Sequence, residues 1–184
     1  MAAESGWLAG ARRIPSPNSD SRPPGTAVSL VLLHSISLPR GEYRGDAIER
    51  LFTNGLDARL DPSVDPAFAD LAGLRVSSHF LIRRGGGLLQ FVPLQARAWH
   101  AGVSRWRGRE RCNDFSVGIE LEGVDDDGFA AAQYACLATL IGKLQTVLPL
   151  RDVAAHSDVA PGRKSDPGTH FDWARFLRQL ARAA

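Results

Sequence analysis

The feature that most constrains this chain is an apolar run that ends at a histidine. Residues 28–33 are all Val or Leu apart from Ser29, and His34 follows directly. A run without polar alternation is typical of a strand buried on both faces of a sheet. It is far shorter than the roughly 20 apolar residues that cross a membrane, so no membrane span or membrane partner is expected. His34 is therefore predicted at the end of a central strand.

A hairpin and an alternating strand are predicted in the middle of the chain. Residues 76–82 and 88–92 are apolar runs joined by a glycine-rich connection, as in two adjacent antiparallel strands. Residues 115–122 alternate between apolar and polar side chains, so Glu120 and Glu122 are expected on one polar face. Residues 96–114 lack periodicity and are expected to form a long surface loop beside the functional site.

Apolar residues at helical spacing predict four helices. They are expected over residues 44–53, 65–71 and 130–148 and after Asp172, whose carboxylate is expected to cap the last helix. That last helix is predicted to bury Trp173, Phe176, Leu177 and Leu180.

Strands and helices intersperse without a regular β-α-β succession. The predicted fold class is therefore α/β, with a central mixed β-sheet flanked by helices. With 184 residues, of which 44% are hydrophobic and 23% charged, the chain suits a single domain over residues 1–184. Residues 1–26 are rich in proline and serine and are predicted to form an extended N-terminal arm packed on this domain.

Composition argues against several functional classes. Cys112 and Cys136 are too few for a dense disulfide framework and are expected to be reduced thiols. The sequence pI is 8.8, but the arginines are scattered and Lys143 and Lys164 are the only lysines, so no nucleic-acid partner is expected. The start of the chain lacks the pattern of a secretory signal, so export is not expected.

A candidate metal site comes from three residues far apart in the sequence. His34, His156 and Asp166 supply two imidazoles and one carboxylate. Catalytic zinc commonly has three such protein ligands and leaves the fourth position to water. The spacing alone is weak evidence, because the chain has no compact H-E-x-x-H motif. The alternative is that the histidines are ordinary surface or core residues and that Asp-Pro-Gly at residues 166–168 is a turn.

Ordered segments over nearly the whole chain resemble one known family. In chain order they are residues 6–8 (GWL), 11–13 (ARR), 15–18 (PSPN), 34–39 (HSISLP), 75–79 (RVSSH), 99–104 (WHAGVS), 108–116 (GRERCNDFS), 118–123 (GIELEG), 160–168 (APGRKSDPG) and 171–176 (FDWARF). These segments resemble the AmpD family, the cytosolic 1,6-anhydro-N-acetylmuramyl-L-alanine amidases. That family belongs to the zinc amidase group that includes phage amidases and peptidoglycan recognition proteins. The resemblance implies the zinc amidase fold of this group.

The resemblance also implies catalytic roles. His34, His156 and Asp166 would bind one Zn²⁺ ion, Glu120 would handle the proton, and Lys164 would stabilise the developing oxyanion. Two neutral imidazoles and one carboxylate leave such a site positively charged, which lowers the pKa of bound water toward about 7.

Two of these roles have alternatives that the pattern leaves open. Glu122 shares the polar face with Glu120, so the choice of Glu120 depends on the family pattern, and either side chain could simply be solvated. Lys164 lies two residues before Asp166, so in an extended loop both side chains point the same way. The alternative for Lys164 is a solvated loop lysine.

Substrate-binding residues are likewise implied by the resemblance. Arg75 and Arg111 would contact the stem-peptide carboxylates, which suit a guanidinium fork. Trp99 and His100 would line the sugar end, although Trp99 is equally suited to a core position. Ser35 departs from the family pattern, in which asparagine follows the first ligand, and this puts its role in substrate contact in doubt. His79 lies within an apolar strand and is expected to be structural.

Three functions are weighed. The leading prediction is zinc-dependent hydrolysis of the amide bond between 1,6-anhydro-N-acetylmuramic acid and L-alanine, by a cytoplasmic monomer that acts on small muropeptides during peptidoglycan recycling. The second is a catalytically inactive protein that binds or senses the same fragments. The third is an exported amidase acting on intact cell wall. Because the proposed ligands and both Glu120 and Lys164 are present, the enzyme is preferred to the binding protein.

Overall fold

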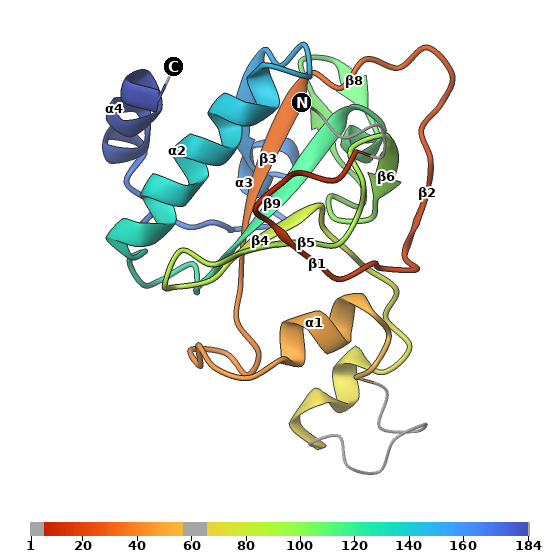
Figure 1. The fold of residues 1–184 in the computed structure, drawn as a ribbon. Helices are drawn as coiled ribbons and strands as arrows, with labels where there is room; N and C mark the ends of the chain where they lie inside the picture. The colour runs from red at the N-terminus through yellow and green to blue at the C-terminus, as the bar shows by residue number, and fades with distance from the viewer. Residues whose placement is uncertain (1–5, 57–65, 184) are drawn as a thin grey trace.

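The computed structural model describes residues 6–56 and 66–183, which are built around a six-stranded sheet (Figure 1). Its strands follow the order β1 (Arg12–Arg13), β5 (Leu88–Gln90), β4 (Phe80–Ile82), β9 (Ser116–Glu122), β3 (Leu30–Ile36) and β10 (Asp152–Ala155). The β4–β5 hairpin is antiparallel, and the other neighbouring strands of this sheet are parallel. The predicted mixed sheet and its hairpin are confirmed.

The central strand β3 has both faces buried, as its apolar run predicted. Val31 and Leu33 face a core that includes residues of α2 (Ala131–Gln145) and α4 (Trp173–Ala183). Leu30 and Leu32 face the opposite side, where Phe115 and Val159 cover them. Figure 1 shows α2 crossing one face of the sheet with α4 beside it. The sheet is therefore the middle layer, covered on both sides.

Shorter elements cover the second face. The helix α1 (Ala47–Phe52) packs with the 3-10 helix η1 (Pro66–Leu71) against β4 and β5. The 3-10 helix η2 (Cys112–Phe115) and the single-turn helix α3 (His156–Val159) cover β3. Two small ribbons complete the described elements: β2 (Ser19–Ser21) with β6 (Ala96–Ala98), and β7 (Arg105–Trp106) with β8 (Arg109–Glu110).

The structure corrects several expected details. Leu177 is 56% exposed rather than buried, because the side of the helix that packs on the core is formed by Trp173, Phe176 and Leu180. The polar face of β9 is not solvated: every residue of that strand is buried. The long loop over residues 96–114 contains three short strands and most of a 3-10 turn. The helix predicted over residues 65–71 is a 3-10 helix that spans Pro66–Leu71. Residue 65, the first of the predicted range, lies outside the described residues.

The remaining expectations on helices agree with the structure. Asp172 caps α4, since its Oδ1 accepts a 2.8 Å hydrogen bond from the backbone N–H of Arg175.

Within the described part of the chain, no helix has both the length and the apolar character needed to cross a membrane.

Candidate active site

The register of three parallel strands brings the predicted site residues to one edge of the sheet. His34 of β3 pairs directly with Glu120 of β9. On the other side Ala155, the last residue of β10, pairs with Leu33, so His156 emerges beside His34. The carboxyl ends of parallel strands are where ligands commonly bind in α/β sheets. Residues more than a hundred positions apart in the chain therefore meet here.

His34, His156 and Asp166 form a compact cluster of ligand atoms. Nδ1 of His34 lies 3.0 Å from Nδ1 of His156 and 3.1 Å from Oδ2 of Asp166, and the latter two atoms are 3.0 Å apart. Tetrahedral zinc, with bonds of about 2.0–2.1 Å, places its ligand atoms roughly 3.3 Å apart. The cluster therefore has the donor set and nearly the spacing that such an ion requires.

The outer nitrogen of each imidazole contacts another protein group. Nε2 of His156 lies 3.1 Å from the carbonyl oxygen of Ala101, which can only accept a hydrogen bond, so Nε2 carries a proton and donates it. Nε2 of His34 lies 2.9 Å from Nδ1 of His100. Burial lowers the pKa of His34 to about 4, so this ring is neutral near pH 7 and available as a ligand.

The loop that carries Asp166 is held by contacts that the sequence did not predict. The carbonyl oxygen of Asp166 accepts a 3.0 Å hydrogen bond from the backbone N–H of Ser157. The hydroxyl of Ser165 donates to Asp125 at 2.5 Å, and Arg40 pairs with the same carboxylate at 2.9 Å. Asp125 thus joins the ligand loop to the segment after β3. No signal in the sequence marked it, because a single aspartate in a polar turn has no distinctive pattern.

Glu120 and Glu122 share a face of β9 but have different surroundings. Arg83 pairs with Glu122, and the backbone N–H of Arg84 donates to it at 2.9 Å, so this carboxylate belongs to a structural ion pair. Glu120 lies beside His34 and is 7% exposed. Burial, reinforced by the charge of Asp166, raises the pKa of Glu120 well above its usual range, and Lys164 opposes the shift. The geometry therefore favours Glu120 as the carboxylate of the site.

Lys164 and Ser35 line a groove that opens over Asp166. The groove has a volume of about 410 Å³, and Arg40, Asp125 and Arg163 also contribute to its walls. Lys164 is exposed, and its charge lowers the pKa of both Glu120 and His34, which places its ammonium within electrostatic reach of the cluster. Lys164 and Asp166 both line this groove.

Arg111 lies in an adjoining groove, of about 600 Å³, that shares Arg163 with the first. Its backbone is in the left-handed region, with φ of 60°, and its Nε is 3.5 Å from Asp114. Arg105 also lines this groove. The guanidinium of Arg111 is exposed and positioned where an anionic group in the groove could reach it.

The remaining predicted substrate residues are not among those that line these two grooves. Arg75 is exposed in a depression beside α1 and η1, and its guanidinium donates to the adjacent carbonyl of Leu74. Trp99 is half-buried, and its backbone pairs with Ser77. His100 packs against His34 with both ring nitrogens near protein groups, an arrangement that does not favour the predicted contact with a sugar.

His79 has the structural role expected for it. It is fully buried, its Nδ1 accepts a 3.0 Å hydrogen bond from the backbone N–H of Gly118, and its Nε2 lies 3.2 Å from the carbonyl oxygen of Ala96. Burial lowers the pKa of His79 to about 3. It does not belong to the cluster of ligand atoms.

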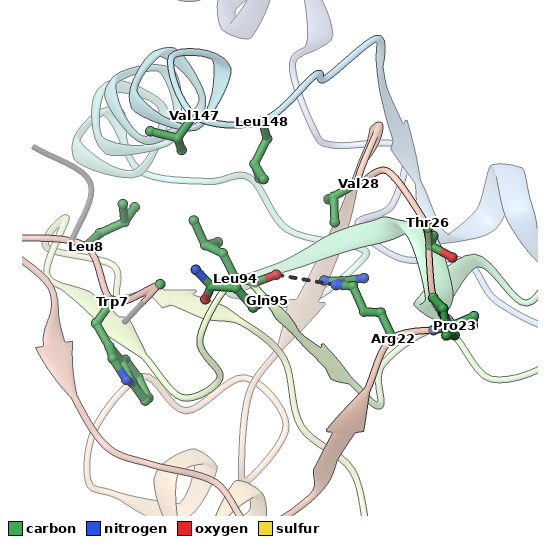
Figure 2. A pocket seen from close by; sticks show the side chains of 13 residues that line it. Trp7, Leu8, Arg22, Pro23, Thr26, Val28, Leu94, Gln95, Val147 and Leu148 are labelled. Atoms are coloured by element: carbon green, nitrogen blue, oxygen red, sulfur yellow. Dashed lines mark hydrogen bonds between the residues drawn. The ribbon is translucent and has the colours of Figure 1, made fainter. Parts of the chain in front are cut away.

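A separate apolar hollow lies beside the N-terminal segment (Figure 2). Its volume is about 510 Å³, and Trp7, Leu94 and Leu148 are among the side chains that line it. Among the described residues that line it, the one charged side chain is that of Arg22. Its guanidinium donates to the carbonyl oxygens of four residues: Leu94, Asn113, Asp114 and Ser116. The described side chains of this hollow do not bring together metal-ligand atoms as His34, His156 and Asp166 do.

Comparison with known proteins identifies the family. The profile described as N-acetylmuramoyl-L-alanine amidase matches residues 24–169. The curated 1,6-anhydro-N-acetylmuramyl-L-alanine amidase AmpD of Escherichia coli is 52% identical over 178 residues, covering 96% of this chain and 95% of that protein. The chain belongs to the AmpD family of N-acetylmuramoyl-L-alanine amidases.

Solved structures of this family have the same fold. The crystal structure of a selenomethionine derivative of AmpD superposes with a TM-score of 0.90 at 51% identity, covering 98% of this chain and 99% of that one. The amidase AmiD of E. coli, solved with the substrate anhydro-N-acetylmuramic acid-L-Ala-D-γ-Glu-L-Lys, superposes with a TM-score of 0.60 at 29% identity. That match covers 86% of this chain and 60% of AmiD. AmpD-family membership therefore rests on sequence and on structure.

Proposed function

We propose that this protein is a zinc-dependent amidase that hydrolyses the amide bond between 1,6-anhydro-N-acetylmuramic acid and L-alanine in muropeptides. The observation that carries the proposal is the cluster of His34, His156 and Asp166, with ligand atoms 3.0–3.1 Å apart beside Glu120. The chain that forms it is 52% identical to a curated enzyme of this activity.

Zinc held by these three residues would polarise the scissile carbonyl and lower the pKa of water at its open position. Glu120 is the group that moves protons. Its burial and its neighbour Asp166 raise its pKa, which brings it closer to the range in which a carboxylate both accepts and returns a proton near neutral pH. It would take a proton from the attacking water and deliver it to the leaving amine of L-alanine.

Lys164 supplies positive charge at the mouth of the groove. Negative charge builds on the carbonyl oxygen as water attacks, and a fixed ammonium nearby stabilises that charge more in the transition state than in the substrate. The effect of its charge on the pKa of Glu120, which it lowers, supports this role.

Substrate recognition is assigned to the arginines and to the groove walls. Arg111 would bind a stem-peptide carboxylate in the second groove, and Arg75 would approach from the segment after η1. Trp99 would pack against the sugar, and Ser35 would contact substrate from the floor of the first groove with a single hydroxyl. We further propose that the protein works as a cytosolic monomer in peptidoglycan recycling, as the family resemblance implies.

The decisive experiment is cleavage of anhydro-N-acetylmuramyl-tripeptide, followed by mass spectrometry. Purified protein is assayed as isolated, after chelation, and after zinc is restored. Release of free tripeptide that disappears with chelation and returns with zinc is the expected result. Intact substrate after incubation with fully zinc-loaded protein would contradict the amidase and favour a protein that only binds such fragments.

A further inference from the structure

His100 lies behind His34 in a notch of the central sheet. The notch exists because Gly118 of β9 has no side chain: a Cβ atom there would come within 2.6 Å of the His100 ring. Glycine within a strand often marks the close approach of another group. The fold therefore makes room in its central strand for this imidazole.

The contacts of His100 connect it to a metal ligand. Its ring meets the ring of His34 edge-on, with centroids 5.0 Å apart and planes at 87°. Nδ1 of His100 is 2.9 Å from Nε2 of His34, and Nε2 of His100 is 3.4 Å from the hydroxyl of Ser116. If Nδ1 of His34 presents its lone pair to an ion, the proton of His34 must be on Nε2, and His100 Nδ1 accepts it.

The same short segment supports the second imidazole ligand. The carbonyl oxygen of Ala101 accepts the Nε2–H of His156 at 3.1 Å. The backbone here is fixed by Asn113, whose Oδ1 accepts hydrogen bonds from the N–H groups of Ala101 at 2.8 Å and His100 at 3.3 Å. Two consecutive residues thus provide the outer hydrogen-bond partners of both histidine ligands.

We propose that His100 is a positioning residue of the metal centre. Its Nδ1 accepts the Nε2–H of His34 and thereby fixes the tautomer and the ring orientation that direct His34 Nδ1 toward the ion. Outer partners of this kind typically change metal affinity by about 10- to 100-fold when they are lost. The inference deepens the proposed function and depends on it, and it gives His100 a role other than contact with the sugar.

The test compares two amide substitutions of similar polarity. His100→Asn places an amide near the position of Nδ1, where its oxygen can still accept from His34. His100→Gln places the amide near the position of Nε2, where it faces Ser116 instead. Zinc affinity is measured by competition with a chelator, and the visible spectrum of the Co²⁺-substituted protein reports the ligand geometry. We expect H100N to stay within about threefold of wild type and H100Q to lose 10-fold or more, with an altered Co²⁺ spectrum.

Other outcomes separate this inference from the function on which it depends. Equal zinc affinity in wild type, H100N and H100Q would overturn the positioning role while leaving the amidase intact. Failure of the wild-type protein to bind zinc would instead overturn the proposed function. ¹⁵N NMR of the zinc-loaded wild-type protein decides the hydrogen bond directly: an unprotonated Nδ1 on His100 supports it, and a proton on that atom contradicts it. The same NMR measurement applies if either variant fails to fold.

Discussion

Two glutamates on one strand differ in their proposed roles because their surroundings differ. Glu120 and Glu122 both belong to the buried polar face of β9. Their spacing in the sequence does not distinguish which of them is the catalytic carboxylate. Arg83 and the N–H of Arg84 hold Glu122, whereas Glu120 lies next to His34 in the strand register. The proposed mechanism therefore uses Glu120 for proton transfer, whereas Glu122 ties the hairpin to β9.

The first prediction concerns the proton-transfer role of Glu120. Glu120→Gln keeps the shape of the side chain but removes its ability to accept a proton, so kcat should fall about 10²- to 10⁴-fold. Zinc content should be unchanged, because Glu120 is not in the ligand cluster. Steady-state kinetics and metal analysis check both values. Wild-type turnover in E120Q would remove Glu120 from the mechanism, whatever its zinc content.

The second prediction concerns recognition of carboxylates by arginine. Arg111→Ala and Arg75→Ala should each raise KM for a tripeptide-bearing fragment, since a charge-assisted contact is worth roughly 1.5–3 kcal/mol, or about 10- to 100-fold. Arg151, which is exposed before β10, provides the matched control Arg151→Ala. An unchanged KM in both variants would end the proposed carboxylate-binding role. A larger effect in R111A than in R75A would agree with the place of Arg111 in a groove that adjoins the ligand loop.

At the scale of elements, the sequence predicted types of structure better than contacts. The apolar run of β3, the glycine-rich hairpin and the period of α2 follow from local pattern, because burial selects apolar residues at fixed spacing. The pairing of His34 with Glu120 does not follow from such a pattern, since register is set by contacts between distant strands. Similarly, Leu177 was expected to be buried but is exposed, because helical spacing alone does not show how wide a face the neighbours cover.

The proposed ligand residues show the same contrast: their residue types could be predicted from the sequence, but their contacts could not. His34, His156 and Asp166 could be nominated by donor chemistry and family resemblance. Their convergence depends on the pairing of β3 with β10 and on a loop held by Asp125. The sequence analysis places His100 at the sugar end, and nothing in the neighbouring sequence indicates the notch at Gly118. Outer partners of a metal site are set by tertiary packing, so periodicity does not show them.

The third prediction belongs to α4, which begins next to the capping residue Asp172. Its carboxylate accepts the N–H of Arg175, and an aspartate near a helix N-terminus also interacts favourably with the helix dipole. Asp172→Ala should lower the free energy of unfolding by about 1 kcal/mol, and Asp172→Ser should retain most of it. Urea denaturation monitored by circular dichroism measures the change. Equal losses in D172A and D172S would show that the cap contributes little.

For the whole molecule, the stability of the metal-free protein should depend on pH through histidines that the fold keeps neutral. His79 is fully buried, with a pKa lowered to about 3, whereas an unfolded histidine titrates near 6.5. Below pH 6.5 the unfolded chain therefore binds a proton that the folded chain does not. The contribution of His79 is fully present above that pH and is lost as pH falls toward 3.

The expected slope is about 1.4 kcal/mol per pH unit for this one group between pH 6 and pH 5, a range above the titration of most carboxylates. Urea denaturation of chelated protein at several pH values measures it, and an NMR titration of His79 shows directly whether its ring stays neutral. His79→Asn keeps an acceptor for the N–H of Gly118 while removing the titrating ring, so its stability should fall less steeply with pH. If wild type and H79N have the same slope, the neutral state of His79 does not contribute to the acid sensitivity of the fold. If H79N is shallower by about 1.4 kcal/mol per unit, the histidines packed behind the metal centre limit the pH range in which the site can exist.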